Sequence, residues 1–174
     1  DHARVETEKG HVDANTHDEL KGVYEGVGGK SHDVPKSPLP VVHTSRKGLE
    51  AVAADLAGAG QIALDIETYG ERKGDGLNPW RGEIRLLTRQ RHGGTIHAID
   101  LRSTGYDLGP LKPLIESSPV IAHNAKFDLL WLRVKCGVDA RNVRCTLTAA
   151  RLLAAGTKPG NNLDQCLERF LGVE

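Results

Sequence analysis

The chain contains 174 residues, of which 39% are apolar, and its formal net charge is zero. This length suits one domain with a hydrophobic core, and neutrality excludes a global basic field, so any nucleic acid would be bound by local groups. No apolar run approaches the ~20 residues of a membrane span. The three cysteines lack CxxC or CxxxC spacing, which favours reduced thiols in a cytoplasmic protein over a zinc site or a disulfide framework.

Residues 1–40 form the first predicted segment, and their composition differs from that of the rest. They are polar and charged, contain four of the eight histidines, and end in Pro35, Pro38 and Pro40, which is typical of a linker. Such a segment cannot bury enough apolar area to offset the entropy lost on ordering. We therefore expect a disordered extension or linker, and a first residue other than Met indicates a fragment of a longer polypeptide.

From Val41 onward the sequence alternates between helical and strand-like patterns. The predicted strands are residues 61–68, 83–90, 94–101 and 119–124. The predicted helical segments are residues 44–60, 110–117, 125–137, 145–156 and 161–172, with Thr44 or Ser45 capping the first and Asn161 or Asn162 capping the last. A polar Gly/Pro loop, 71–82, follows the first strand. Three consecutive strands and then helical crossovers predict an α/β domain over 41–174, with a mixed sheet covered by helices.

Two carboxylates, Asp65 and Glu67, stand one residue apart in the strand 61–68. Residues i and i+2 of a strand point to the same face, so these side chains share one. A third carboxylate, Asp128, falls one turn into the helix 125–137, after a short strand, where α/β sheets commonly place their sites. If the two strands are neighbours, Asp128 faces the other two carboxylates. The alternative is that Asp65 and Glu67 are solvent-facing charges on an edge strand.

Three converging carboxylates repel one another unless a cation holds them. Mg²⁺ and Mn²⁺ are hard cations that prefer such oxygen ligands. Two ions about 3.5–4 Å apart are the arrangement used for in-line phosphoryl hydrolysis. The pattern therefore predicts two Mg²⁺ or Mn²⁺ ions at Asp65, Glu67 and Asp128.

These motifs resemble those of the DEDD superfamily of 3′–5′ exonucleases, on the ribonuclease-H-like fold. The string "LDIET" (64–68) is similar to the family's D-x-E motif, and "HNAKFD" (123–128) is similar to N-x-x-[FY]-D. With "NPWRGEIRLLT" and "CTLTAARLLAAG", they look most like the proofreading domain of family A DNA polymerases and its free-standing and ribonuclease D relatives. The resemblance covers 41–174 and implies a mixed sheet, made of a three-strand meander plus a parallel strand, flanked by helices.

The resemblance implies a catalytic role for each of the three carboxylates. Asp65 would bridge both metal ions. Glu67 would ligate one ion and position the attacking water. Asp128 would hold the second ion.

Three further residues of the two motifs would contact the substrate, by the same resemblance. Thr68 would lie beside the terminal nucleotide. Asn124 would orient the second motif and the substrate backbone. Phe127 would pack near the terminal base, although a place in the core is an equal alternative.

The family's third motif, Y-x-x-x-D or H-x-x-x-D, supplies the fourth carboxylate and has no match in the chain. Asp164 is the only late candidate, but Gly160 stands four positions before it, so Asp164 is predicted to be a surface or first-turn helix charge. Because "LDQCLERFLGV" resembles the helix just before the third motif, we expect the C-terminal part of the domain to be missing. Family members often carry Asp where Cys145 stands, so no secondary contact is predicted there.

Exposed cations and aromatic residues have competing interpretations. The arginines in and after the second strand could hold a single-stranded phosphate backbone or protect an edge strand by charge. They are Arg81, Arg85, Arg89, Arg91 and Arg102. Trp80 could stack a base or anchor its loop, whereas Trp131 is predicted to lie in the core.

The sequence thus predicts a 3′–5′ exonuclease that removes nucleoside monophosphates from single-stranded 3′ ends. DNA is favoured over RNA, although no residue visibly reads a 2′-hydroxyl, and a polymerase domain is expected in the same parent chain. No membrane partner is predicted. The alternative is a catalytically weakened nucleic-acid-binding or structural module, because the fourth carboxylate is absent. A ribonuclease-H-like endonuclease is disfavoured by the combination of D-x-E with N-x-x-F-D.

Overall fold

The computed structural model describes residues 39–155 and 160–172. The predicted extension 1–40 therefore lies outside the described residues, except for Leu39 and Pro40. No helix within the described ranges is long and apolar enough to cross a membrane.

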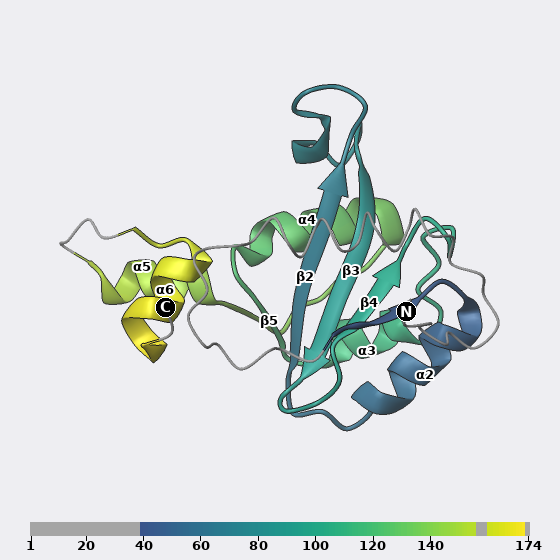
Figure 1. Cartoon of the computed structure of the whole chain (residues 1–174), viewed down its shortest axis with the longest axis horizontal. Helices are drawn as coiled ribbons and strands as arrows, with labels where there is room; N and C mark the ends of the chain where they lie inside the picture. Colours follow the sequence, from purple (N-terminus) through teal and green to yellow (C-terminus); the bar gives the residue numbers. More distant parts are fainter. Residues whose placement is uncertain (1–38, 156–159, 173–174) are drawn as a thin grey trace, which may run out of the picture. The chain divides into compact units, whose positions relative to one another are not determined.

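Within the described residues, six strands form one mixed sheet in the order β1-β4-β3-β2-β5-β6. The strands are β1 (Val41–His43), β2 (Ile62–Tyr69), β3 (Glu83–Arg91), β4 (His97–Asp100), β5 (Val120–Ala122) and β6 (Val143–Cys145). Strands β2, β3 and β4 form an antiparallel meander, and β5 runs parallel to β2 (Figure 1). The predicted meander with a parallel strand is confirmed. The sequence did not predict β1 and β6, because three residues are too few to show an alternating pattern.

Helices connect these strands and follow the predicted segments closely. They are α2 (Arg46–Leu56), α3 (Leu111–Ser117), α4 (Ala125–Cys136), α5 (Thr146–Leu153) and α6 (Leu163–Leu171), with the 3₁₀ turn η1 (Asp75–Leu77) between β2 and β3. Ser45 caps α2 by accepting a hydrogen bond from the Gly48 N–H. Asn162 caps α6 through a capping box with Gln165. The helices α2 and α6 therefore begin at the capping residues that the sequence predicts.

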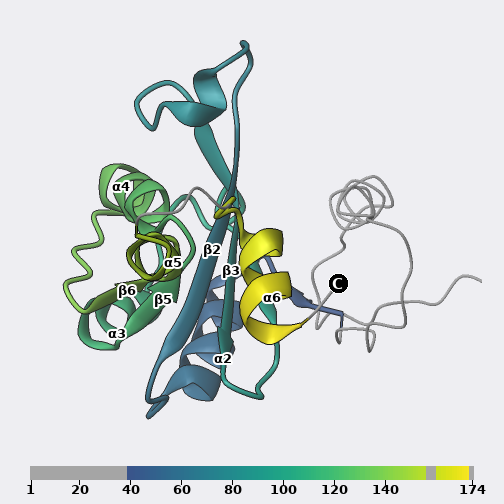
Figure 2. The ribbon, with the colours of Figure 1, turned by 90° about the vertical axis from the view of Figure 1, so that its left-hand side faces the viewer.

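A hydrophobic cluster joins the sheet to α2, α3 and α4. Each of these helices contributes fully buried residues, for example Val52, Leu111 and Trp131. Figure 2 looks at β2 and β3 nearly edge-on and shows α3 and α4 on the same side of these strands. Trp131 is 0% exposed, which confirms its predicted place in the core.

Strand β2 has one buried face and one exposed face. Ile62, Leu64 and Ile66 are buried, while the residues between them are exposed. Asp65 and Glu67 therefore lie on the face opposite the core. This is how the strand carries two neighbouring charges without the cost of burying them in apolar surroundings.

Candidate active site

Two of the three predicted metal ligands lie on β2, and the third lies on α4. Asp65 and Glu67 project from the exposed face of β2. Asp128 lies in the first turn of α4 and is only 3% exposed. Its Oδ1 accepts a hydrogen bond of 3.1 Å from the backbone N–H of Ile66. The helix and the strand are thus joined at the residue between the other two carboxylates.

The short β5 strand explains why Asp128 takes this position. β5 pairs with β2 only at Ile62 and Ala63, so a backbone N–H further along that edge of β2 needs another acceptor. Asn124 follows β5 in the left-handed conformation, with φ of 61°, which asparagine tolerates better than most residues. The turn directs the chain into α4, and Asp128 reaches the free N–H of Ile66.

The pKa values of the three carboxylates are all raised above their ordinary values. Burial, with the charges of Asp65 and Glu67, raises the pKa of Asp128 to about 7, although backbone hydrogen bonds act in the opposite direction. Asp65 and Glu67 are exposed, yet neighbouring protein still removes part of their hydration, which raises the pKa of each. The charge of Asp65 adds to the shift at Glu67. All three shifts have the sign expected for a carboxylate cluster without a compensating cation.

The donor set suits a hard divalent cation, because it consists of carboxylate oxygens alone. In the described part of the chain, however, no three His, Cys, Asp or Glu side chains are arranged so as to hold one ion. Asp65 and Glu67 are exposed side chains whose rotamers can change. The ligands therefore fit Mg²⁺ or Mn²⁺ in chemistry, and their oxygens must move together to bind it.

The other predicted site residues have different surroundings. Thr68 donates a hydrogen bond of 2.6 Å from Oγ1 to the Gly76 carbonyl oxygen, so it ties β2 to the following loop. The side chain of Asn124 is exposed and does not cap α4. Phe127 packs against the core, its ring centroid 6.1 Å from that of Trp131. Phe127 therefore has at least the core role that the sequence left open.

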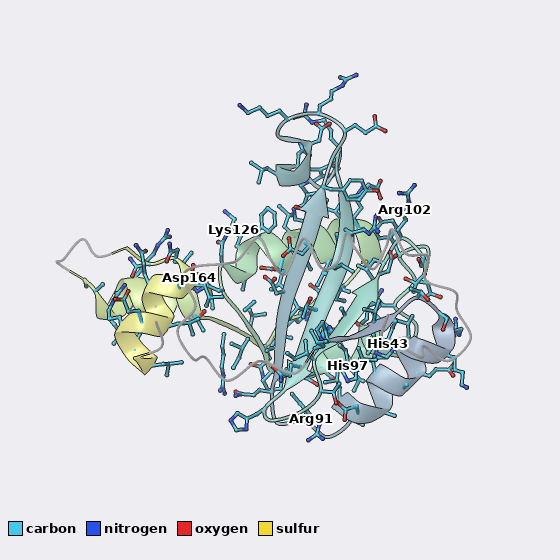
Figure 3. All side chains as sticks on the ribbon, in the orientation of Figure 1. His43, Arg91, His97, Arg102, Lys126 and Asp164 are labelled. Carbon is cyan, nitrogen blue, oxygen red and sulfur yellow. The ribbon has the colours of Figure 1, made fainter. Side chains whose placement is uncertain are left out.

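Among residues 160–172, the late carboxylate is part of a helix surface. Asp164 is an exposed side chain in the first turn of α6 (Figure 3), in agreement with its predicted role as a helix charge. The ring of His123 lies 3.0 Å from Thr146 Oγ1 through Nδ1 and 3.0 Å from the Asn161 carbonyl oxygen through Nε2. His123 thus links the start of α4 to the segments that begin α5 and precede α6.

The arginines do not form one phosphate-binding groove. Arg89 is only 1% exposed, and its guanidinium nitrogens have no hydrogen-bond partner among the described residues. It shares the core face of the sheet with Leu64, its partner in the β2–β3 register. Arg91 lies 3.4 Å from Asp55, through Nε and Oδ1. The sequence interpretation failed because exposure was assumed for every arginine, whereas strand register turned Arg89 toward the core.

Sequence reasoning missed Lys126, which stands inside the second motif. It lies in the first turn of α4, two residues before Asp128, and its side chain is exposed (Figure 3). Its place between Asn124 and Asp128 in the sequence was the available signal. A cation at this position can attract the phosphates of a polyanion.

The fold and the site together define a class of protein. A mixed sheet of this topology, with D-x-E on the central strand and N-x-x-F-D at the start of the helix after the neighbouring parallel strand, is that of a ribonuclease-H-like nuclease domain. The family model for 3′–5′ exonuclease matches residues 40–174. The chain belongs to this family, the DEDD 3′–5′ exonucleases, which are phosphodiester hydrolases.

Solved structures agree with this assignment. The apo form of a nuclease is 28% identical with a TM-score of 0.60, covering 71% of this chain and 56% of that chain. Brucella melitensis NrnC with bound Mg²⁺ is 25% identical with a TM-score of 0.59, covering 69% and 58%. Trypanosoma brucei RNase D in complex with RNA U12 is 17% identical with a TM-score of 0.66, covering 76% and 47%, and shares the fold. The chain thus spans about half the length of these relatives. No curated protein matches the sequence significantly.

Proposed function

We propose that this domain hydrolyses the last phosphodiester bond at the 3′ end of single-stranded nucleic acid, with two Mg²⁺ or Mn²⁺ ions. The observation that supports this proposal most is the hydrogen bond from the Ile66 N–H to Asp128, which ties the first turn of α4 to the segment of β2 between Asp65 and Glu67. Membership of the 3′–5′ exonuclease family supports the reaction. The Mg²⁺ bound to the related NrnC supports the choice of metal.

Each carboxylate takes a separate task in this proposal. Asp65 would ligate both ions. Asp128, fixed by Ile66, would ligate the second ion, and Glu67 would orient the attacking water. When bound, the ions would neutralise the carboxylates and polarise the phosphate. Hydrolysis adds the water oxygen to phosphorus and breaks the bond to the 3′ oxygen of the preceding nucleotide, so that a nucleoside monophosphate leaves.

The substrate contacts are proposed for the residues beside the carboxylates. Thr68 and Asn124 would bind the terminal nucleotide, and Phe127 would support its base. RNase D is solved with RNA U12, and NrnC with pGG, which supports a nucleic-acid substrate. DNA as the preferred substrate, and a polymerase domain in the parent chain as partner, rest on the resemblance to proofreading domains.

A second candidate function is a catalytically weakened module that binds nucleic acid. Two observations favour it. Within 39–155 and 160–172 no three ligands are preassembled for one ion. The late carboxylate, Asp164, is an exposed charge on α6.

Release of mononucleotides separates the two functions. A strand labelled at its 3′ end is incubated with Mg²⁺ or Mn²⁺, as DNA and as RNA of the same sequence. We expect labelled mononucleotide from the wild-type chain, none from Asp65→Ala, and an unchanged rate from Asp164→Ala, which removes an exposed carboxylate elsewhere. Labelled fragments longer than one nucleotide would indicate internal cutting and reject the exonuclease proposal.

The same experiment decides the binding-module alternative. If the wild-type chain releases nothing with either metal, the exonuclease proposal is wrong for this chain. Binding of the labelled strand would then be measured by fluorescence anisotropy in EDTA. Binding without release would support the weakened module, and neither binding nor release would reject both functions.

A further inference from the structure

The loop between β2 and β3, residues 70–82, is folded around one buried carboxylate. Asp75 is only 8% exposed. Its Oδ2 accepts a hydrogen bond of 3.2 Å from the Arg72 N–H, and its Oδ1 lies 3.7 Å from Arg81 Nε. Its carbonyl oxygen accepts a hydrogen bond of 2.9 Å from the Asn78 N–H. The loop therefore has a defined structure of its own, in which both ends are held to Asp75.

Close packing at two glycines adds to this rigidity. A Cβ on Gly70 would overlap Asp75 Cβ and lie 2.9 Å from the Gly76 nitrogen. A Cβ on Gly82 would lie 2.7 Å from the Tyr69 carbonyl oxygen and 2.8 Å from Trp131 Cη2. The base of the loop is thus packed against β2 and the core, and its conformation is fixed relative to both.

The loop carries an exposed aromatic ring, that of Trp80, together with exposed cationic side chains. Trp80 is 70% exposed, although its backbone N–H is held by Asn78 Oδ1 at 3.0 Å. The ring therefore does not anchor the loop, which was the alternative to base stacking. Arg72, Lys73 and Arg81 are exposed on the same loop. The loop's carboxylates are Glu71 and Asp75, of which Asp75 is buried near Arg81.

A hollow of about 350 Å³ lies at the base of the loop, and its lining residues are Tyr69, Gly70, Glu71, Asp75, Arg81, Glu83 and Arg102. Its three carboxylates outnumber its two arginines, so the cations that can meet phosphates are those exposed on the loop itself. Arg102 is exposed (Figure 3). An aromatic ring flanked by arginines and lysines is the chemistry that binds single-stranded nucleic acid, since bases stack on the ring and phosphates pair with the cations.

The loop also stands at a suitable distance from the carboxylates. It begins three residues after Glu67, and a strand rises about 3.3 Å per residue, so its start lies roughly 10 Å from that carboxylate along β2. Thr68 joins the strand to the loop through its bond to Gly76. In Figure 1 the loop extends past the end of β2. A strand whose 3′ end sits at Asp65 and Glu67 can therefore reach the loop with its preceding nucleotides.

We propose that the 70–82 loop is a second binding site for the substrate strand, in which a base stacks on Trp80 and phosphates pair with Arg72, Lys73 and Arg81. The proposal rests on the exonuclease function for the direction of the strand. The partner is unpaired nucleic acid, because a base within a duplex has its faces covered by its neighbours. The loop then sets the length of unpaired strand that the domain binds well.

Binding is tested without catalysis, through the fluorescence of the full chain. The chain has two tryptophans, and Trp131 is fully buried, so quenching by an added strand reports on Trp80. A ten-nucleotide oligothymidylate is titrated in EDTA. We expect quenching in the wild type. Trp80→Ala lacks the reporter ring, so its affinity is measured by the anisotropy of a labelled oligonucleotide, and it should fall by about 5- to 140-fold, which corresponds to ~1–3 kcal/mol per stacked base.

Matched variants exclude a general loss of structure. Trp80→Phe keeps a ring and should retain most of the affinity, measured by the anisotropy of a labelled oligonucleotide. Phe170→Ala removes another exposed aromatic ring, on α6, and should leave affinity unchanged. Equal affinity of wild type and Trp80→Ala would overturn the proposal, and so would equal losses in the alanine variants of Trp80 and Phe170.

Kinetics separate this proposal from the exonuclease function. The p-nitrophenyl ester of thymidine monophosphate carries one nucleotide, too short to span from the carboxylates to the loop. Trp80→Ala should lower kcat/KM for the ten-nucleotide strand while leaving hydrolysis of the ester unchanged. Equal reductions on both substrates would overturn the loop's role. If the wild type hydrolyses neither substrate, the exonuclease function fails, and the binding titration still decides the loop.

Discussion

Replacing Asp128 by Asn should make the domain more stable while removing its proposed activity. The Asn side chain retains an oxygen that can accept the hydrogen bond from the Ile66 N–H. It removes a charge from a side chain that is 3% exposed and whose pKa is raised by burial and by the charges of Asp65 and Glu67. In EDTA no metal ion neutralises that charge, so the charged Asp128 lowers the stability of the folded wild type.

The size of the effect follows from the shifted pKa. The pKa of Asp128 is raised from 3.8 to about 7, and one unit corresponds to 1.36 kcal/mol. Because the folded-state pKa is the higher one, folding favours the protonated acid, and stability falls as the pH rises from about 4 through 7. Asp128→Asn should therefore stabilise the domain by less than about 1 kcal/mol at pH 4 and by at most roughly 4 kcal/mol at pH 8.

Urea denaturation at a series of pH values tests this prediction, with circular dichroism as the signal. The difference in free energy of unfolding between variant and wild type should grow from pH 4 to pH 8 in EDTA. Saturating Mg²⁺ should stabilise the wild type, by about 2.7 kcal/mol at a hundredfold excess over Kd, and should reduce or cancel the difference. A stability difference that does not depend on pH, or a less stable variant at pH 8, would refute the reasoning.

Three further substitutions test other parts of the structure. Burial lowers the pKa of Arg89 to about 9, because the charged form is unfavourable in the core. Arg89→Met should therefore raise the free energy of unfolding, measured by urea denaturation, by about 1–4 kcal/mol. A decrease would reveal a partner for this guanidinium. Gly82→Ala should destabilise the domain by about 1–3 kcal/mol. It should also shift the fluorescence emission of Trp131, because the new Cβ would lie 2.8 Å from that ring. Gly60→Ala is the control, since a Cβ there has nothing within 4 Å, and it should change neither stability nor emission. Asn162→Ala should cost about 1 kcal/mol and increase amide exchange at Gln165, whose N–H donates to Asn162 at 2.8 Å; unchanged exchange there would contradict the capping role.

Local patterns predicted the elements that are long or capped. Alternation of Ile62, Leu64 and Ile66 with polar residues marks β2, and Ser45 and Asn162 mark the starts of α2 and α6. The edge strands β1 and β6 were missed, because they are short and depend on pairing with β4 and β5. Their strand conformation is stabilised by hydrogen bonds to partners far away in sequence, which no local pattern contains.

The arginines of β3 show that the sequence does not predict which charged side chains are exposed. Arg89 and Arg91 look alike as positive charges. In the described part of the chain, Arg89 is buried without a hydrogen-bond partner, whereas Arg91 lies beside Asp55 at the surface. Their surroundings depend on the register of three strands and on the helix packed over them. Exposure was therefore a property of the tertiary structure, and the sequence interpretation that treated both as surface charges was wrong for Arg89.

The sequence by itself determined the family and the order of the main elements, and it predicted the three carboxylates, because each rests on residue types at short, fixed spacings. Tertiary structure alone decided how those carboxylates stand toward one another. Asp128 reaches β2 because β5 ends early and leaves the Ile66 N–H without a strand partner. Tertiary structure also decided that Trp80 is exposed while Trp131 is buried. Both outcomes depend on which segments meet in space, and packing between distant residues settles that.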